Sequence, residues 1–302
     1  MKLSTVKNII LSVIFTSLCL PDNISAQEII EIDPIFEYPV APEEIESITE
    51  KSDYLVKHFW DQLDFKSTAP LNQIALNDAF RVYLTPVRFA PEKSALQSLE
   101  TLLNNISGNP TLLVQFIKAA EENLYGPRAE IWSDEIYLKF LDAGIKNKKV
   151  SQTRKDKYRQ RAALLRANAT GNSPQSFQFE DASGKQETYI PMSTPTILVF
   201  GDPEDTDWRL SRLKLDTNTP FAQALEKGKI NIIYISLNEN EGWKDAVSTY
   251  PKYWITGICP GITDVYDIRV LPSLYLIGSD GKIIMKNAPL GQVVAKALEL
   301  VN

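Results

Sequence analysis

The chain has 302 residues, with 32 basic and 38 acidic side chains and a formal net charge of −6. This length is sufficient for two domains of ordinary size, each with its own core. The acidic balance, without long runs of like charge or a basic stripe, argues against nucleic acid and anionic membrane surfaces as partners.

Residues 1–26 have the pattern of a secretory signal peptide. Lys2 and Lys7 precede an apolar run at Ile9–Phe15, and Ala26 offers a small residue for cleavage. Polar residues interrupt the apolar run, which is short for a membrane span. We therefore expect an exported protein, periplasmic or associated with the cell envelope, with no membrane span after the signal is removed.

Two alternatives to cleavage after Ala26 remain open: an uncleaved anchor, and a lipoprotein attached through Cys19. Leu18 stands where a lipoprotein signal has Gly or Ala, which argues against lipid attachment. Cleavage after Ala26 removes Cys19 and leaves Cys259 as the single cysteine. The mature chain is therefore expected to form no internal disulfide.

Residues 27–42 are acidic and punctuated by proline, which predicts an extended leader. Residues 43–169 are predicted to form an all-α domain of about six helices, because apolar residues recur at helical spacing between short connections. The first helix begins at Ser47-Ile48-Thr49-Glu50, which has the capping-box pattern. The other predicted helices span residues 72–87, 91–106, 110–125, 133–145 and 151–168.

The sequence changes in character near Thr170. Turn-forming residues between 168 and 173 predict an accessible connection, and residues 170–302 then alternate short apolar runs with helical segments. This alternation predicts a separately folding α/β domain with one mixed sheet, so the fold class is α+β with two domains. The predicted strands lie near 177–179, 196–200, 230–235, 254–255, 270–277 and 283–286, with helices from about Trp208, near Trp243 and from Pro289.

The run 270–277, followed by the turn 279–282, resembles the proline-bearing hairpin of thioredoxin-like proteins. Gly171, Pro174 and Phe177 match the entry motif of their secreted, peroxiredoxin-related branch. The mature chain resembles an uncharacterised family of secreted bacterial proteins in which a helical domain of unknown function precedes a thioredoxin-like domain. Its segment Tyr54-Leu55-Val56-Lys57-His58-Phe59-Trp60-Asp61 resembles the first helix of that family.

By this resemblance Pro272 is expected to follow a cis peptide bond, and Leu271 to present its backbone to an extended peptide. Members of the family often carry Asn-Pro-x-Cys-x-x-Cys after the central strand. Aligned on Phe200 and Pro203, this chain has Asp205 and Trp208 at the two cysteine positions. Because thiol–disulfide exchange requires cysteine, the resemblance implies the fold without the dithiol chemistry. We expect Trp208 to add apolar contact area to a peptide-binding site formed with Leu271 and Pro272.

An acidic loop contains Asp202, Glu204, Asp205 and Asp207. Clustered carboxylates can bind calcium, but this spacing does not fit the EF-hand loop. The alternative is that Asp205 or Asp207 caps the helix that starts near Trp208, where its charge also favours the helix dipole.

Cys259 and His58 are the remaining candidates for chemistry. Cys259 has apolar neighbours, so a quiet thiol that behaves as a small hydrophobe is the alternative to a catalytic one. His58 lies between Lys57 and Phe59 on a predicted helix, which is typical of a packed or interfacial residue. One histidine and one mature cysteine do not suffice for a tetrahedral zinc site built on those ligands.

These observations predict an exported, catalytically silent thioredoxin-like protein that acts as a binding or assembly module in the cell envelope. We expect a protein or peptide partner, no cofactor and no resident metal. The first alternative is a single-cysteine thiol redox enzyme that uses Cys259. The second is a function in the helical domain, with the thioredoxin-like part as a scaffold.

Overall fold

The structure is a computed structural model that describes residues 33–238 and 242–302. The predicted signal peptide and the start of the predicted leader lie outside the described residues. From Pro34 to Asn302 the chain forms one compact unit. No helix among the described residues combines the length and apolar character needed to cross a bilayer.

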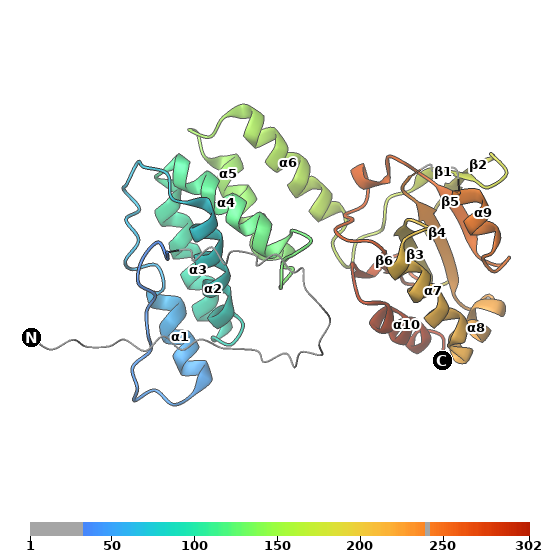
Figure 1. Cartoon of the computed structure of the whole chain (residues 1–302), viewed down its shortest axis with the longest axis horizontal. Helices are drawn as coiled ribbons and strands as arrows, with labels where there is room; N and C mark the ends of the chain where they lie inside the picture. The colour runs from blue at the N-terminus through green and yellow to red at the C-terminus, as the bar shows by residue number, and fades with distance from the viewer. Residues whose placement is uncertain (1–32, 239–241) are drawn as a thin grey trace, which may run out of the picture. The chain divides into compact units, whose positions relative to one another are not determined.

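The predicted helical part is confirmed. Six helices precede residue 168, drawn from blue to green in Figure 1. They are α1 (Ile48–His58), α2 (Gln73–Val87), α3 (Glu92–Ser107), α4 (Pro110–Leu124), α5 (Asp134–Lys146) and α6 (Gln152–Ala167).

Side-chain caps set where three of these helices begin. Asn72 accepts hydrogen bonds from two amides in the first turn of α2, and Asn109 and Ser133 each accept one before α4 and α5. The capping box predicted at Ser47 is wrong, because that side chain makes no capping hydrogen bond. The α1 terminus has Glu50 in its first turn instead, where a negative charge favours the helix dipole.

The core of the helical part centres on α2, α4 and α5. Phe80, Phe116 and Phe140 are fully buried, and the Phe80 ring lies 6.2 Å from that of Phe116 and 5.5 Å from that of Phe140, both edge to face. Such pairs add about 0.5–1.5 kcal/mol beyond the burial of their area. The buried residues of this core all lie between Val56 and Leu165.

The second part contains the predicted mixed sheet, in the order β2-β1-β5-β4-β3-β6-β7. Strands β3, β4 and β5 are parallel to one another, and the remaining pairs are antiparallel. The strands are β1 (Phe177–Asp181), β2 (Gln186–Tyr189), β3 (Thr196–Gly201), β4 (Asn231–Ser236), β5 (Ile255–Ile258), β6 (Ser273–Ile277) and β7 (Ile283–Lys286).

Strand β3 is an interior strand of this sheet, between β4 and β6 (Figure 1), and is buried throughout. Ile197 and Val199 face a core shared with the helices, and Leu198 and Phe200 face a second, aromatic core on the other side. The helices are α7 (Thr206–Thr217), α8 (Thr219–Glu226), α9 (Trp243–Ser248) and α10 (Leu290–Glu299).

Helix α8 was not predicted as a separate element. Asn218 ends α7 and its side chain accepts a hydrogen bond from the Phe221 amide (3.1 Å), while Pro220 occupies the first turn of α8. An Asn cap followed by proline in the first turn is a helix-start signal, so the sequence carried the information.

In the connection between the two parts, residues 170–173 are exposed, and the connection also makes hydrogen bonds to the second part. The side chain of Asn168 donates from Nδ2 to the Val265 carbonyl (2.9 Å). The Gly171 amide donates to the carbonyl of Ile283, and the Ile283 amide donates to the carbonyl of Asn172, both over 2.8 Å. Separate folding of residues 43–169 and 170–302 stays a prediction.

A buried charge cluster also joins the two parts. Asp267 is fully buried and accepts hydrogen bonds from Arg269 Nη2 (2.7 Å), Lys286 Nζ (2.8 Å) and the Tyr125 hydroxyl (2.9 Å). Asp134, the first residue of α5, pairs with Arg269 and with Lys286 (2.6 Å). The two acids and two bases balance, as buried charges require.

Burial alone would raise the pKa of Asp267. The hydrogen bond from Arg269 and the positive charges of Lys286 and Arg269 outweigh burial and hold this pKa below its ordinary value of 3.8. The Arg269 guanidinium also lies 4.5 Å from the ring centroid of Tyr125 and 5.3 Å from that of Trp132, both in the helical part.

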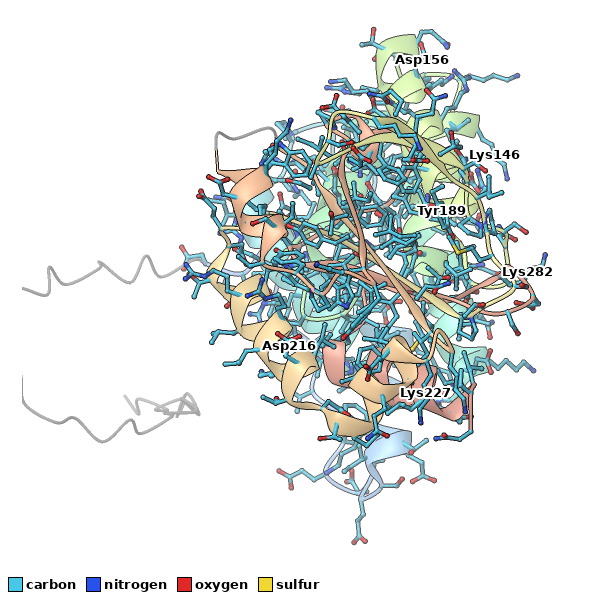
Figure 2. All side chains as sticks on the ribbon, turned by 90° about the vertical axis from the view of Figure 1, so that its right-hand side faces the viewer. Lys146, Asp156, Tyr189, Asp216, Lys227 and Lys282 are labelled. Atoms are coloured by element: carbon cyan, nitrogen blue, oxygen red, sulfur yellow. The ribbon has the colours of Figure 1, made fainter. Side chains whose placement is uncertain are left out.

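We predict that Asp267→Asn lowers the free energy of unfolding by about 3–5 kcal/mol, because it leaves two buried cations short of a partner. Asp134→Asn should cost less, since the Asp134 side chain is 27% exposed. The control is Asp156→Asn, which removes an exposed carboxylate of α6 (Figure 2). This carboxylate bonds to Arg159 and Gln152 of the same helix, and its loss should change stability by no more than about 0.5 kcal/mol. Urea denaturation at neutral pH measures all three.

The same cluster predicts a pH dependence. Because the folded pKa of Asp267 lies below its unfolded value, its contribution is complete above the unfolded pKa and is lost as the pH falls through the folded pKa. Between about pH 6 and about pH 2 the wild type should therefore lose more stability than Asp267→Asn. Equal losses in the two proteins would show that Asp267 does not carry this dependence.

Candidate functional site

The candidate site begins where β3 ends and α7 starts. The Asp205 carboxylate accepts a hydrogen bond from the Trp208 amide (2.8 Å) and caps α7, which confirms one of the two predicted caps. The position that the sequence alignment assigns to the first cysteine thus holds a carboxylate, which caps the amides of a helix N-terminus and is favoured by the helix dipole. This group holds a negative charge there and has no thiol chemistry.

Trp208, at the second cysteine position, is fully buried. Its ring stacks on Tyr234 with centroids 5.0 Å apart, and its indole nitrogen donates to the Tyr250 hydroxyl (2.7 Å). Trp254 completes this aromatic cluster, 6.2 Å from the Trp208 ring. The expected contribution of Trp208 to a binding surface is therefore corrected: the indole fills the space between α7 and the sheet and offers no contact area to a peptide.

Leu271 and Pro272 lie beside the end of β3. The bond between them is cis, as expected, and a Cβ placed on Gly201 would lie 3.8 Å from Pro272 Cβ. The main-chain groups of Val270 and Leu271 make no backbone hydrogen bond to any described residue, and Val270 is 37% exposed. Residues 270–271 therefore present a short stretch of unpaired backbone next to the loop that leads into α7.

A single asparagine bonds to a residue before this stretch and to a residue after it. Asn287 donates from Nδ2 to the Asp267 carbonyl and accepts at Oδ1 from the Ser273 hydroxyl, each over 2.8 Å. The Asp267 carbonyl also accepts from the Tyr275 hydroxyl (2.9 Å). Asn287 has φ 49°, in the left-handed region that asparagine tolerates better than most side chains. The loop of residues 268–272 is thus held by hydrogen bonds at Asp267 on one side and at Ser273 on the other.

Cys259 and His58 lie apart in the fold. Cys259 is a half-buried free thiol that follows β5, and burial raises its pKa although the Gly261 amide partly opposes this. A raised pKa leaves less thiolate at neutral pH, so this cysteine lacks the activation of a catalytic thiol. His58 ends α1, where Nδ1 lies 2.8 Å from Asp61 Oδ2 and the ring packs on Tyr54.

The acidic loop is used for local hydrogen bonds. Asp202 Oδ1 accepts from the Glu204 amide (2.9 Å), and Asp205 caps α7. Residues 33–238 and 242–302 contain no group of three acidic, histidine or cysteine side chains placed to hold a metal ion. The calcium interpretation of Asp202, Glu204, Asp205 and Asp207 has no support in the described structure.

Sequence reasoning missed the residues that position the loop: Asp267, Arg269, Lys286 and Asn287. Charged residues near a hairpin are ordinary surface residues by pattern, and Asp134, which pairs with Arg269, is 135 positions away in the sequence. The one available signal was an asparagine directly after a strand, because this residue favours left-handed backbone.

The comparisons place the fold. A thioredoxin-like protein from Bacteroides caccae matches with a TM-score of 0.71 and 20% identity, over 89% of this chain and 99% of that protein. A conserved protein of unknown function from Bacteroides fragilis covers 43% of this chain at 23% identity, 98% of its own length and a TM-score of 0.40. The thioredoxin domain of a thiol-disulfide oxidoreductase from Bacteroides vulgatus covers 44% at 20% identity, 99% of its own length and a TM-score of 0.39.

No curated protein sequence matches the chain. Its C-terminal part has a thioredoxin-like fold, as the similarity to the Bacteroides caccae structure shows. The family described as a domain of unknown function, DUF5106, matches residues 15–168, just over half of the sequence, and the chain belongs to this family.

Proposed function

We propose that this chain is an exported, redox-inactive binding or assembly protein of the cell envelope, whose thioredoxin-like part binds an extended segment of a partner protein at Leu271 and Pro272. The observation that carries the proposal is the replacement of both cysteine positions. Asp205 caps α7, and Trp208 is buried in an aromatic cluster. Neither side chain can form or exchange a disulfide.

The unpaired backbone beside Pro272 supports the recognition part of the proposal. An extended peptide can pair with free main-chain N–H and C=O groups as an additional strand, and this mode needs no cysteine. The backbone groups of Val270 and Leu271 make no backbone hydrogen bond to a described residue, and Asn287 bonds to Asp267 before them and to Ser273 after them. A loop held in its binding conformation loses less entropy when it binds.

Export and the envelope location rest on the pattern of residues 1–26. The single-cysteine alternative is less well supported, because burial raises the pKa of Cys259 and no described residue offers it the electropositive surroundings of an activated thiol.

One observation favours the second alternative, a function in the helical part. A pocket of about 430 Å³ is lined by residues of α1 and α3 and by the segment after α1, including Trp60, Phe65, Gln97 and Ser98. A cavity of this size falls within the range of small-molecule sites. Binding that maps to this pocket would transfer the function to the helical part.

We predict no dithiol oxidoreductase activity. In an insulin-reduction assay, the mature protein and its Cys259→Ser variant should both match the rate of the reductant alone. Cys259→Ser should lower stability by no more than about 1 kcal/mol, because the thiol is only half-buried. Turnover in the wild type that disappears in Cys259→Ser would instead establish the single-cysteine enzyme.

A second prediction concerns the loop. The probe is a peptide selected from a random seven-residue library by the mature chain. Asn287→Gly keeps the left-handed backbone accessible and removes both side-chain hydrogen bonds, so it should cost about 1–2 kcal/mol of stability. The dissociation constant of the Asn287→Gly variant for the peptide should be about tenfold higher than that of the wild type, equivalent to about 1.4 kcal/mol. Asn287→Ala, which adds backbone strain, should bind no better than Asn287→Gly. Wild-type affinity in both folded variants would exclude this loop from binding.

A further inference from the structure

A pocket of about 290 Å³ lies between α7 and α9, and its residues include Pro203 and Glu204 of the loop after β3. Two arginines of α7, Arg209 and Arg212, line it together with Thr249 and Tyr250. The same loop follows Gly201, the residue next to Pro272. The loop between β3 and α7 therefore begins beside Pro272 and lines the pocket with Pro203 and Glu204, while Leu271 and Pro272 are outside the lining.

Arg212 is held in place at the pocket wall. Its Nη1 donates to the Thr249 hydroxyl (2.8 Å), and its guanidinium carbon lies 4.7 Å from the centroid of the Tyr250 ring. The Tyr250 hydroxyl in turn accepts from the buried Trp208 indole, which fixes the ring on which Arg212 rests. A guanidinium has five N–H donors, so this arrangement leaves most of them available to a ligand.

The charges of the pocket favour an anion. Neither Arg209 nor Arg212 forms an ion pair with a carboxylate in the described parts of the chain, and Arg212 is bonded only to uncharged groups. Among the residues that the structure describes, Glu204 is the one acid of the lining, so the described lining carries a net single positive charge. A planar guanidinium fixed against an aromatic ring is well suited to bind a carboxylate through two parallel hydrogen bonds.

We propose that this pocket binds an acidic side chain, Asp or Glu, of the peptide that pairs with residues 270–271. The inference rests on the proposed function and names the class of peptide. A volume near 290 Å³ is at the lower limit of small-molecule sites and suits one side chain better than a whole ligand. The acidic residue supplies both affinity and direction, because it fixes which end of the extended segment lies over α7.

The test uses the whole mature chain and a library of random seven-residue peptides. Each peptide is inserted within a carrier protein, so that it has no free C-terminal carboxylate. The wild type should select peptides with Asp or Glu enriched at one position. Arg212→Gln and Arg209→Gln should lose this enrichment. The matched control is Lys214→Gln, which removes one positive charge from an exposed position of the same helix outside the pocket and should keep it.

A selected peptide then gives the energetic comparison. Arg212→Gln should raise its dissociation constant about tenfold or more, and replacing the acidic residue of the peptide by its amide should have the same effect. Combining both changes should add little, as expected for two groups that contact each other. Thermal unfolding confirms that each variant is folded, and exposed Arg209 provides a variant with little structural risk.

The outcomes separate the two proposals. Selected peptides without acidic enrichment, or enrichment that Lys214→Gln abolishes equally, would overturn the acidic pocket and leave the peptide edge standing. A second library presents the same peptides with free C-termini. If peptides are selected only from this library, with the preference at the last residue, the pocket binds a terminal carboxylate and the side-chain assignment is overturned. Failure to select any peptide would overturn both.

Discussion

The geometry of the candidate edge depends on one buried carboxylate, that of Asp267. Its side chain binds Arg269, Lys286 and Tyr125, and its carbonyl accepts from Asn287 and Tyr275. The side chain thus contacts the helical part while the carbonyl closes the loop that carries Leu271 and Pro272. A buried charge persists only with its partners in place, so the helical part and this loop are structurally linked.

The start of α7 carries a negative charge on a helix N-terminus and has no cysteine. A helix N-terminus stabilises a negative charge, whether that charge is a thiolate or a carboxylate. Here the charge belongs to Asp205, and a buried indole occupies the position of the second thiol. Restoring the cysteine pair would therefore require a smaller side chain at residue 208 and the repacking of Tyr234, Tyr250 and Trp254. We propose that the residues at the two cysteine positions now serve helix capping (Asp205) and core packing (Trp208), and that the backbone of residues 270–271 still binds a peptide.

Local pattern predicted the six helices, the mixed sheet and the cis bond before Pro272, because each depends on residues close in sequence or on the resemblance. Trp208 could not be placed in this way. Its burial depends on Tyr234, Tyr250 and Trp254, which come from later elements of the sheet part. The charge cluster could not be predicted from local sequence patterns for the same reason, since Tyr125 and Asp267 are 142 positions apart. Helix α8 was predictable from Asn218 and Pro220. Ser47 shows the opposite case, because it has the capping-box pattern but its side chain makes no capping hydrogen bond.

The central claim is that recognition remains at the edge beside Pro272 although the chemistry has been lost. Hydrogen–deuterium exchange on the full mature chain, with and without a selected peptide, tests it most directly. Because a paired strand protects main-chain amides, the account predicts slower exchange at Val270 and Leu271 when the peptide is bound. Protection confined to α1, α3 and the segment after α1, around Trp60 and Ser98, with no change at residues 270–271, would contradict the claim and place the binding function in the helical part.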